Sequence, residues 1–281
     1  MTVPKPAVLG RPLLVLDFDG VICDSIHDSF RTALNTYIRF RKGHALPLRK
    51  PLDTAEATFR FEREHPEVFE RFRAILPLGN RAEDYCVMLT ILYRGEAGSI
   101  TGQDDFDAYG KTISPQEQRE YHRLFYEDRN RLQKADPKDW SGLLPIFPGM
   151  AGALHRLSRR FVLCIATSKD RASVDLQMKA YGIEPLFLPE NILDKDFAES
   201  KRDHLVRLHE RHGVPFSSIH FIDDKVLHLV SVKDLGAKCY LATWGFNTPR
   251  EHKIAEREGF VLLTMDGLKE LGGKMEPGSG G

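Results

Sequence analysis

Three short apolar runs of the chain each end in polar residues of the kinds that phosphoryl transfer needs. Carboxylates can act as nucleophile, proton donor or metal ligand, and hydroxyl and ammonium groups can bind phosphate oxygens. A glycine close by lets the backbone turn sharply. These polar ends are Asp17-Phe18-Asp19-Gly20, Thr167-Ser168-Lys169 and Asp223-Asp224.

The apolar runs themselves predict buried β-strands. Residues 12–16 are apolar without alternation, which is typical of a strand covered on both faces, and 161–167 and 219–222 are strand-like runs whose apolar residues are joined by Thr167 and His220. Two further strand-like runs lie at 238–242 and 260–263. Helical spacing of apolar residues between these runs indicates a parallel, doubly wound sheet. In such a sheet the carboxyl ends of the strands form the binding edge, so the polar residues are expected to meet there.

A long helical stretch interrupts this pattern directly after the first acidic turn. Ser114, Pro115 and Glu117 predict a helix start, with Ser114 as the N-cap, and Asp53 with Glu56 suggests another. We therefore expect an α/β core with a helical insertion. The predicted bounds are 1–24 and 145–275 for the core, 25–144 for the insertion and 276–281 for a flexible tail.

The composition excludes some classes of partner. Lys+Arg and Asp+Glu both total 40, so the chain has no bulk charge that would favour nucleic acid or an anionic membrane. The four cysteines show no CxxC spacing and are expected to be buried free thiols in a reducing compartment. The N-terminus has no apolar signal-peptide core. These features predict a cytoplasmic protein.

Four ordered segments together resemble the haloacid dehalogenase-like hydrolase superfamily. They are LDFDGVICDS at 16–25, IATSK at 165–169, Lys201 at an expected helix start, and FIDDKVLHL at 221–229. The insertion falls where the family places its C1 helical cap. The resemblance is to the capped phosphatase branch, similar to phosphoglycolate phosphatases, and it implies a Rossmann-like α/β core with a large cap.

The resemblance also implies roles for the polar residues. Asp17 would attack phosphorus and form an aspartyl-phosphate, while Asp19 would protonate the leaving oxygen and later deprotonate water. Thr167 would hydrogen-bond the phosphoryl group, and Lys201 would neutralise its charge. Dehalogenases of the superfamily have no acid at the position of Asp19, so a phosphate ester is the expected substrate. The expected catalytic set is Asp17, Asp19, Thr167 and Lys201.

A Mg²⁺ site and a substrate site follow from the same resemblance. The implied metal ligands are Asp17, the Asp19 backbone carbonyl, Asp224 and Asp223, where Asp223 would bind the ion through water or instead orient Lys201. Phosphate and substrate contacts are expected from Gly20, Ser168, Lys169, Asn80 and Arg81. For Lys169 a role as a surface charge is an equal alternative, and for Asn80 and Arg81 a plain helix start is at least as good an explanation.

Two departures from the family pattern leave alternatives open. His228 stands four residues after Asp224, where many members have an aspartate, and we interpret it as structural rather than catalytic. Arg202 follows Lys201 where proline is common, and Lys195 is a rival for the role of the lysine.

The expected function is hydrolysis of the phosphate monoester of a small soluble metabolite by a monomer or homodimer, with no nucleic acid and no membrane as partner. A phosphomutase and a non-catalytic binding protein on the same fold are the alternatives. Phosphate release would separate a hydrolase from a mutase.

Overall fold

The computed structural model describes residues 10–41, 47–48, 50–79, 81–198 and 200–271. They fall into two compact units. The α/β unit comprises the described parts of 1–23, 146–245 and 251–281, and the helical unit comprises those of 24–145 and 246–250. The predicted tail at 276–281 lies outside the described residues.

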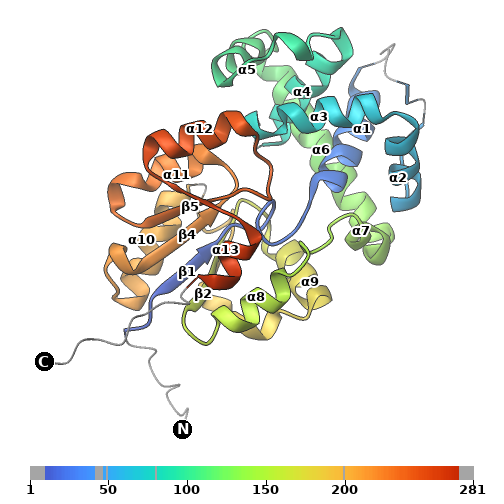
Figure 1. Ribbon diagram of the computed structural model, residues 1–281. Coiled ribbons are helices and arrows are strands. Elements are labelled where there is room, and N and C mark those ends of the chain that lie inside the picture. The colour runs from blue at the N-terminus through green and yellow to red at the C-terminus, as the bar shows by residue number, and fades with distance from the viewer. Residues whose placement is uncertain (1–9, 42–46, 49, 80, 199, 272–281) are drawn as a thin grey trace, which may run out of the picture. The chain divides into compact units, whose positions relative to one another are not determined.

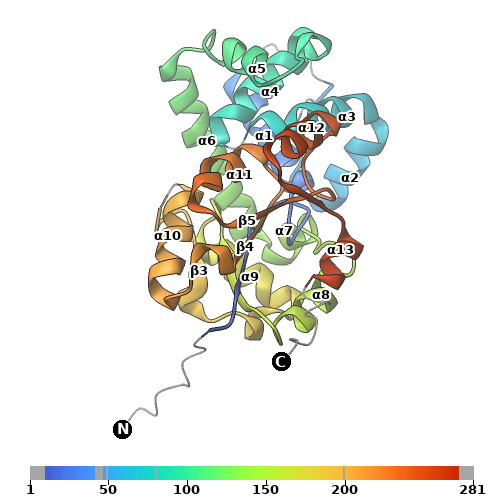
Figure 2. The ribbon, with the colours of Figure 1, turned by 60° about the vertical axis from the view of Figure 1, so that its left-hand side comes forward.

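The α/β unit is built on a parallel sheet (Figure 1, Figure 2). Its six strands lie in the order β3-β2-β1-β4-β5-β6, so β1 pairs with both β2 and β4. This arrangement confirms the predicted fold class. The strands are β1 (Leu13–Leu16), β2 (Val162–Ala166), β3 (Ile192–Leu193), β4 (Ile219–Asp223), β5 (Lys238–Ala242) and β6 (Val261–Leu263).

Helices cover both faces of the sheet, which is why β1 is apolar at every position. All four of its side chains are fully buried. Leu13 and Val15 pack in one cluster with residues of α10, α11 and α12, while α8, α9 and α13 lie on the opposite side in Figure 1. The helices are α8 (Met150–Leu157), α9 (Arg171–Tyr181), α10 (Lys201–His212), α11 (Val226–Val232), α12 (Pro249–Glu258) and α13 (Met265–Glu270).

The helical unit surrounds a core rich in aromatic residues. Phe30, Phe72 and Tyr121 are buried in one cluster there. The predicted start of the longest helix is confirmed: Ser114 accepts a hydrogen bond from the Glu117 N–H, and Pro115 is the first helical residue. The helices are α1 (Ile26–Phe40), α2 (Ala55–Glu64), α3 (Pro66–Ile75), α4 (Ala82–Arg94), α5 (Gln103–Gly110), α6 (Pro115–Ala135) and α7 (Pro137–Gly142).

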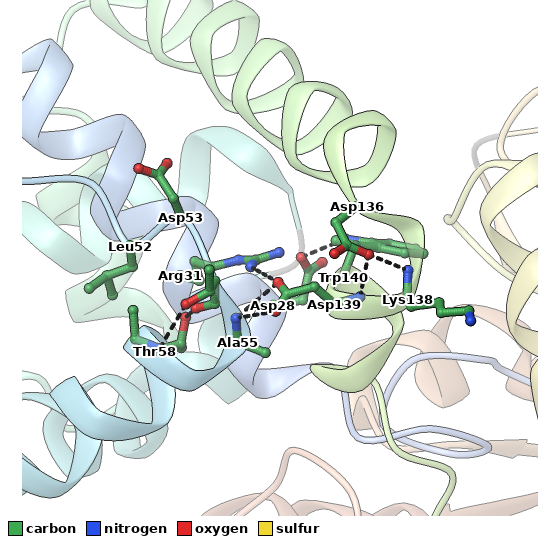
Figure 3. A network of polar contacts seen from close by, with 12 residues as sticks. Asp28, Arg31, Leu52, Asp53, Ala55, Thr58, Asp136, Lys138, Asp139 and Trp140 are labelled. Atoms are coloured by element: carbon green, nitrogen blue, oxygen red, sulfur yellow. Dashed lines mark hydrogen bonds and ion pairs between the residues drawn. The ribbon is translucent and has the colours of Figure 1, made fainter.

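A buried polar network ties three helices of this unit together (Figure 3). The carboxylate of Asp139 in α7 accepts hydrogen bonds from the Arg31 guanidinium of α1 at 3.2 Å and from the first amide of α2, Ala55, at 2.9 Å. The Trp140 indole N–H donates to Asp28 at 2.9 Å. Charged groups inside the unit are thus balanced by partners on neighbouring helices.

The described residues contain no helix that combines the length and the apolar character needed to cross a membrane. All four cysteines are buried and free, as predicted, while the reducing compartment stays a prediction.

Candidate active site

The strand order brings the polar strand ends together. β1 lies between β2 and β4, with Leu16 level with Ile165 and Ile222. The next residue, Asp17, donates its amide to the Ile222 carbonyl at 2.9 Å. Asp17, Thr167 and Asp223 therefore emerge side by side at the carboxyl edge of the sheet.

Asp17 is held by one buried lysine. Its side chain is 10% exposed, and the Lys201 ammonium lies 2.9 Å from Oδ1. The Phe18 amide donates to the same oxygen at 2.7 Å. Burial raises the pKa of Asp17, and the Lys201 charge opposes that rise. The geometry can therefore present a carboxylate nucleophile beside a fixed positive charge.

Lys201 reaches the site because it is the first residue of α10. Ser200 caps this helix by accepting a hydrogen bond from the Asp203 amide at 3.0 Å. The Lys201 ammonium donates to the Ala166 carbonyl at 2.7 Å and lies 3.3 Å from Asp223 Oδ2. Burial alone would lower the pKa of Lys201, but the neighbouring Asp17 and Asp223 raise it above its usual value.

This position favours Lys201 over its rival. Lys195 is half-buried on the segment before α10, where its amide donates to the Lys169 carbonyl at 3.4 Å. The ammonium that the structure places at Asp17 is that of Lys201.

Asp223 is fully buried and hydrogen-bonded on several sides. It accepts from the Lys225 amide at 2.8 Å, and His228 Nδ1 lies 3.1 Å from both of its oxygens. Burial would raise its pKa, but His228 and Lys201 outweigh that effect and hold the pKa well below its usual range. Asp223 is thus an anion that faces the same lysine as Asp17.

His228 is a contact that the sequence pattern did not assign to the site. One ligand atom from each of Asp17, Asp223 and His228 lies within 4.8 Å of the others. The spacing of five residues between Asp223 and His228, across a strand end and the first turn of α11, was the available signal.

Asp224 lies against two glycines. Gly20 has φ +80°, and a Cβ there would overlap the Asp224 carboxylate. A Cβ on Gly245 would overlap both Asp224 and the Gly20 carbonyl. The role predicted for Gly20 was phosphate contact; the structure shows in addition that its missing side chain makes room for Asp224. Gly245 carried no signal in the sequence.

The three predicted residues that follow β2 differ in their exposure to solvent. Thr167 is buried, and its hydroxyl accepts a hydrogen bond from the Lys169 amide at 3.1 Å. Ser168 is exposed. The Lys169 side chain is fully buried, and its ammonium lies 3.0 and 3.1 Å from the two carboxylate oxygens of Asp19. Lys169 is therefore not a surface charge.

The remaining predicted residues belong to the helical unit. Asn80 lies outside the described residues. Arg81 precedes α4, its side chain is 73% exposed, and its amide donates to Asp84 at 2.8 Å. Substrate contact by Asn80 and Arg81 stays a prediction.

The charges of the site fit a divalent cation. Three buried carboxylates, Asp17, Asp223 and Asp224, lie at this edge. The Lys201 ammonium faces Asp17 and Asp223, and His228 faces Asp223. Carboxylate oxygens are the ligands that hard divalent ions prefer, and one ligand atom each from Asp17, Asp223 and His228 lies within 4.8 Å of the others. The residues present therefore suit such an ion.

Comparison with known proteins agrees with this fold. A model of the haloacid dehalogenase-like hydrolase family matches residues 12–236. A haloacid dehalogenase-like family hydrolase from Streptococcus pneumoniae is 16% identical, with a TM-score of 0.56 over 93% of this chain and 97% of that one.

Two further solved structures are similar. For a predicted phosphoglycolate phosphatase from Haemophilus somnus 129PT the identity is 16% and the TM-score 0.58, over 94% of this chain and 97% of that one. A predicted phosphatase from Clostridium acetobutylicum is 14% identical, with a TM-score of 0.55 over 93% of this chain and 97% of that one. These likenesses show a shared fold. Since the family match covers well over half of the sequence, the chain belongs to the haloacid dehalogenase-like hydrolase family.

Proposed function

We propose that this hydrolase is a Mg²⁺-dependent phosphatase that cleaves the phosphate monoester of a small metabolite through an aspartyl-phosphate on Asp17. The observation that carries the proposal is the Lys201 ammonium 2.9 Å from the Asp17 carboxylate. Both groups lie at the strand edge where Thr167 follows the end of β2. A carboxylate that is paired in this way can approach a phosphate dianion because the lysine offsets the repulsion.

In the first half-reaction an oxygen of Asp17 attacks phosphorus. The new bond from phosphorus to Asp17 forms as the bond to the ester oxygen breaks, and Asp19 gives its proton to that oxygen. Thr167 and Lys201 orient the phosphoryl oxygens. The products of this half-reaction are an alcohol and the phosphorylated Asp17.

In the second half-reaction a water molecule attacks the same phosphorus. Asp19 takes a proton from the water, the bond between phosphorus and Asp17 breaks, and inorganic phosphate leaves. Both side chains return to their starting protonation states, so the cycle balances.

Asp17, the Asp19 carbonyl, Asp224 and Asp223 would hold Mg²⁺. When bound, the ion supplies positive charge that offsets the negative charge of the phosphoryl group. Of these residues, Asp223 faces Lys201 and His228, so its predicted contact with the ion is the one with the most competing partners.

A small phosphorylated metabolite is the substrate class we propose, without nucleic acid or membrane as partner. A predicted phosphoglycolate phosphatase among the similar structures supports a compact phosphate ester. The four buried free thiols support a cytoplasmic setting.

The test is phosphate release by the Asp17→Asn variant. With Mg²⁺, p-nitrophenyl phosphate and a panel of phosphorylated metabolites, we expect activity to fall by about 1,000-fold or more, because the amide is not a nucleophile. Asp175→Asn is the matched control, since Asp175 lies on α9 with its side chain 51% exposed.

Turnover near the wild-type level in Asp17→Asn would place the nucleophile elsewhere. Conversion of a sugar phosphate to an isomer without phosphate release would identify a mutase instead.

A further inference from the structure

We propose that Lys169 is a positioning residue that fixes the carboxylate of Asp19 for both of its proton transfers. The inference rests on the proposed function, in which Asp19 is the group that gives and takes the proton. It replaces the role of direct phosphate contact that the sequence suggested for this lysine.

The first support is the burial of Lys169 together with the direction of its ammonium. The side chain has no solvent exposure, and its nitrogen lies 3.0 and 3.1 Å from the two oxygens of Asp19. A buried ammonium persists only where a partner compensates its lost hydration. Its position at Asp19 is therefore a built feature of the site rather than a chance surface pair.

The second support is that the backbone of Lys169 is held on both sides. Its amide donates to the Thr167 hydroxyl at 3.1 Å, and its carbonyl accepts from the Lys195 amide at 3.4 Å. The ammonium thus extends from a point anchored to the end of β2. Asp19, by contrast, sits in the turn after β1 with a side chain that is 32% exposed. The lysine gives this more exposed side chain a fixed direction.

The near-equal distances from the Lys169 ammonium to the two Asp19 oxygens suit a carboxyl group that transfers a proton in both half-reactions. An ammonium centred on both oxygens can keep contact with one while the other turns to the ester oxygen or to water. The Cys23 thiol lies 3.5 Å from Oδ1 and adds a further contact on the same carboxylate. A lysine that served the phosphate would instead direct its charge at the strand edge where Asp17 and Lys201 lie.

The experiment compares two leaving groups in the Lys169→Met variant. p-Nitrophenolate leaves as an anion without a proton, whereas an aliphatic alcohol needs one to leave, so only the alcohol's release depends on Asp19 in the first half-reaction. Single-turnover release is measured by rapid quench for p-nitrophenyl phosphate and for the best alkyl phosphate of the wild-type panel. We expect a loss of about 100-fold for the alkyl ester and of less than about 10-fold for the aryl ester.

A double-mutant cycle supplies a readout that a merely structural lysine would not move. If Lys169 acts through Asp19, Lys169→Met adds little to the loss already caused by Asp19→Asn. Lys169→Arg keeps the positive charge on a side chain of similar reach, and we expect it to recover part of the alkyl-ester rate. Should Lys169→Met fold poorly, Lys169→Gln and its combination with Asp19→Asn carry the same comparison.

Equal losses for the two esters, or losses that multiply in the double variant, would overturn the inference and assign Lys169 to phosphate binding. Such a result leaves the proposed function intact as long as Asp17→Asn is inactive. Activity in Asp17→Asn would refute the proposed function itself.

Discussion

Gly20 shows how a single missing side chain shapes the site. Its φ of +80° strains any other residue, and the space that a Cβ would occupy is taken by Asp224. Gly182, which ends α9, has φ +68° and nothing within 4 Å of the same position. Both glycines therefore need a left-handed backbone, but an added Cβ would collide with a neighbour only at Gly20.

We predict that Gly182→Ala lowers the free energy of unfolding by about 1–2 kcal/mol, the cost of a left-handed residue, and that Gly20→Ala lowers it by more, because its Cβ also overlaps Asp224. Only Gly20→Ala should also reduce phosphatase activity, by about 10-fold or more, because it displaces Asp224. Urea unfolding and kcat measure the two effects. Equal activity in both variants would show that Asp224 tolerates displacement.

At this scale the sequence predicts residue types better than their partners. Asp17, Thr167 and Asp223 all lie at the expected strand edge, because strand ends can be read from apolar runs, and Lys201 begins α10 at the expected helix start. That Lys169 turns to Asp19 was not predictable, since side-chain direction depends on burial by residues remote in sequence.

α10 links the site to the pH behaviour of the fold. Its buried face carries Lys201, His204, Leu205 and Leu208. His204 Nε2 donates to the Asp194 carbonyl at 3.2 Å, which ties the helix to the segment after β3. Burial, with a further contribution from Lys201, lowers the pKa of His204 from 6.5 to about 4.

The unfolded chain therefore binds a proton at His204 at a higher pH than the folded chain does. Stability from this group is complete above about pH 6.5, is lost as the pH falls toward 4, and amounts to at most about 3 kcal/mol. We predict that His204→Gln weakens the dependence of the unfolding free energy on pH between 7 and 5.

Urea unfolding at a series of pH values measures this slope. His155→Gln, at an exposed position on α8, should keep the wild-type slope. A wild-type slope in His204→Gln as well would mean that the imidazole is already charged in the fold.

Elements were predictable wherever local signals were strong. The capping residues before α6 marked its start correctly, and the strand runs matched β1, β2, β4, β5 and β6. β3 was missed because two residues are too short for a pattern. For α2 the expected cap was Asp53, but Thr54 accepts the hydrogen bond from the Ala57 amide, since either side chain suits a cap and only the backbone geometry decides.

The charge balance of the whole molecule hides a local excess. Lys+Arg and Asp+Glu cancel at 40 each, yet three buried carboxylates, Asp17, Asp223 and Asp224, share one edge of the sheet with Lys201 and His228. Burial and the neighbouring Asp223 charge both raise the pKa of Asp17, and a cation bound at these carboxylates would relieve that repulsion and stabilise the fold.

We predict that millimolar MgCl₂ raises the melting temperature by about 3 °C or more, and that EDTA reverses the rise. Asp224→Asn should lose the shift, and Asp266→Asn, at a side chain 86% exposed, should keep it. NaCl at matched ionic strength controls for screening. A full shift in Asp224→Asn would place the ion outside the proposed site.

The path of the chain through its two units bears on how such enzymes can be recombined. The polypeptide enters the helical unit at residue 24, leaves it after 145, and returns for residues 246–250, where Phe246 packs against the aromatic cluster. Excising 24–145 alone would remove the apolar residues that Phe246 packs against and leave its ring exposed on the remaining chain. A graft of this unit onto another family member therefore has to carry both pieces, and its designer must splice at four junctions instead of two.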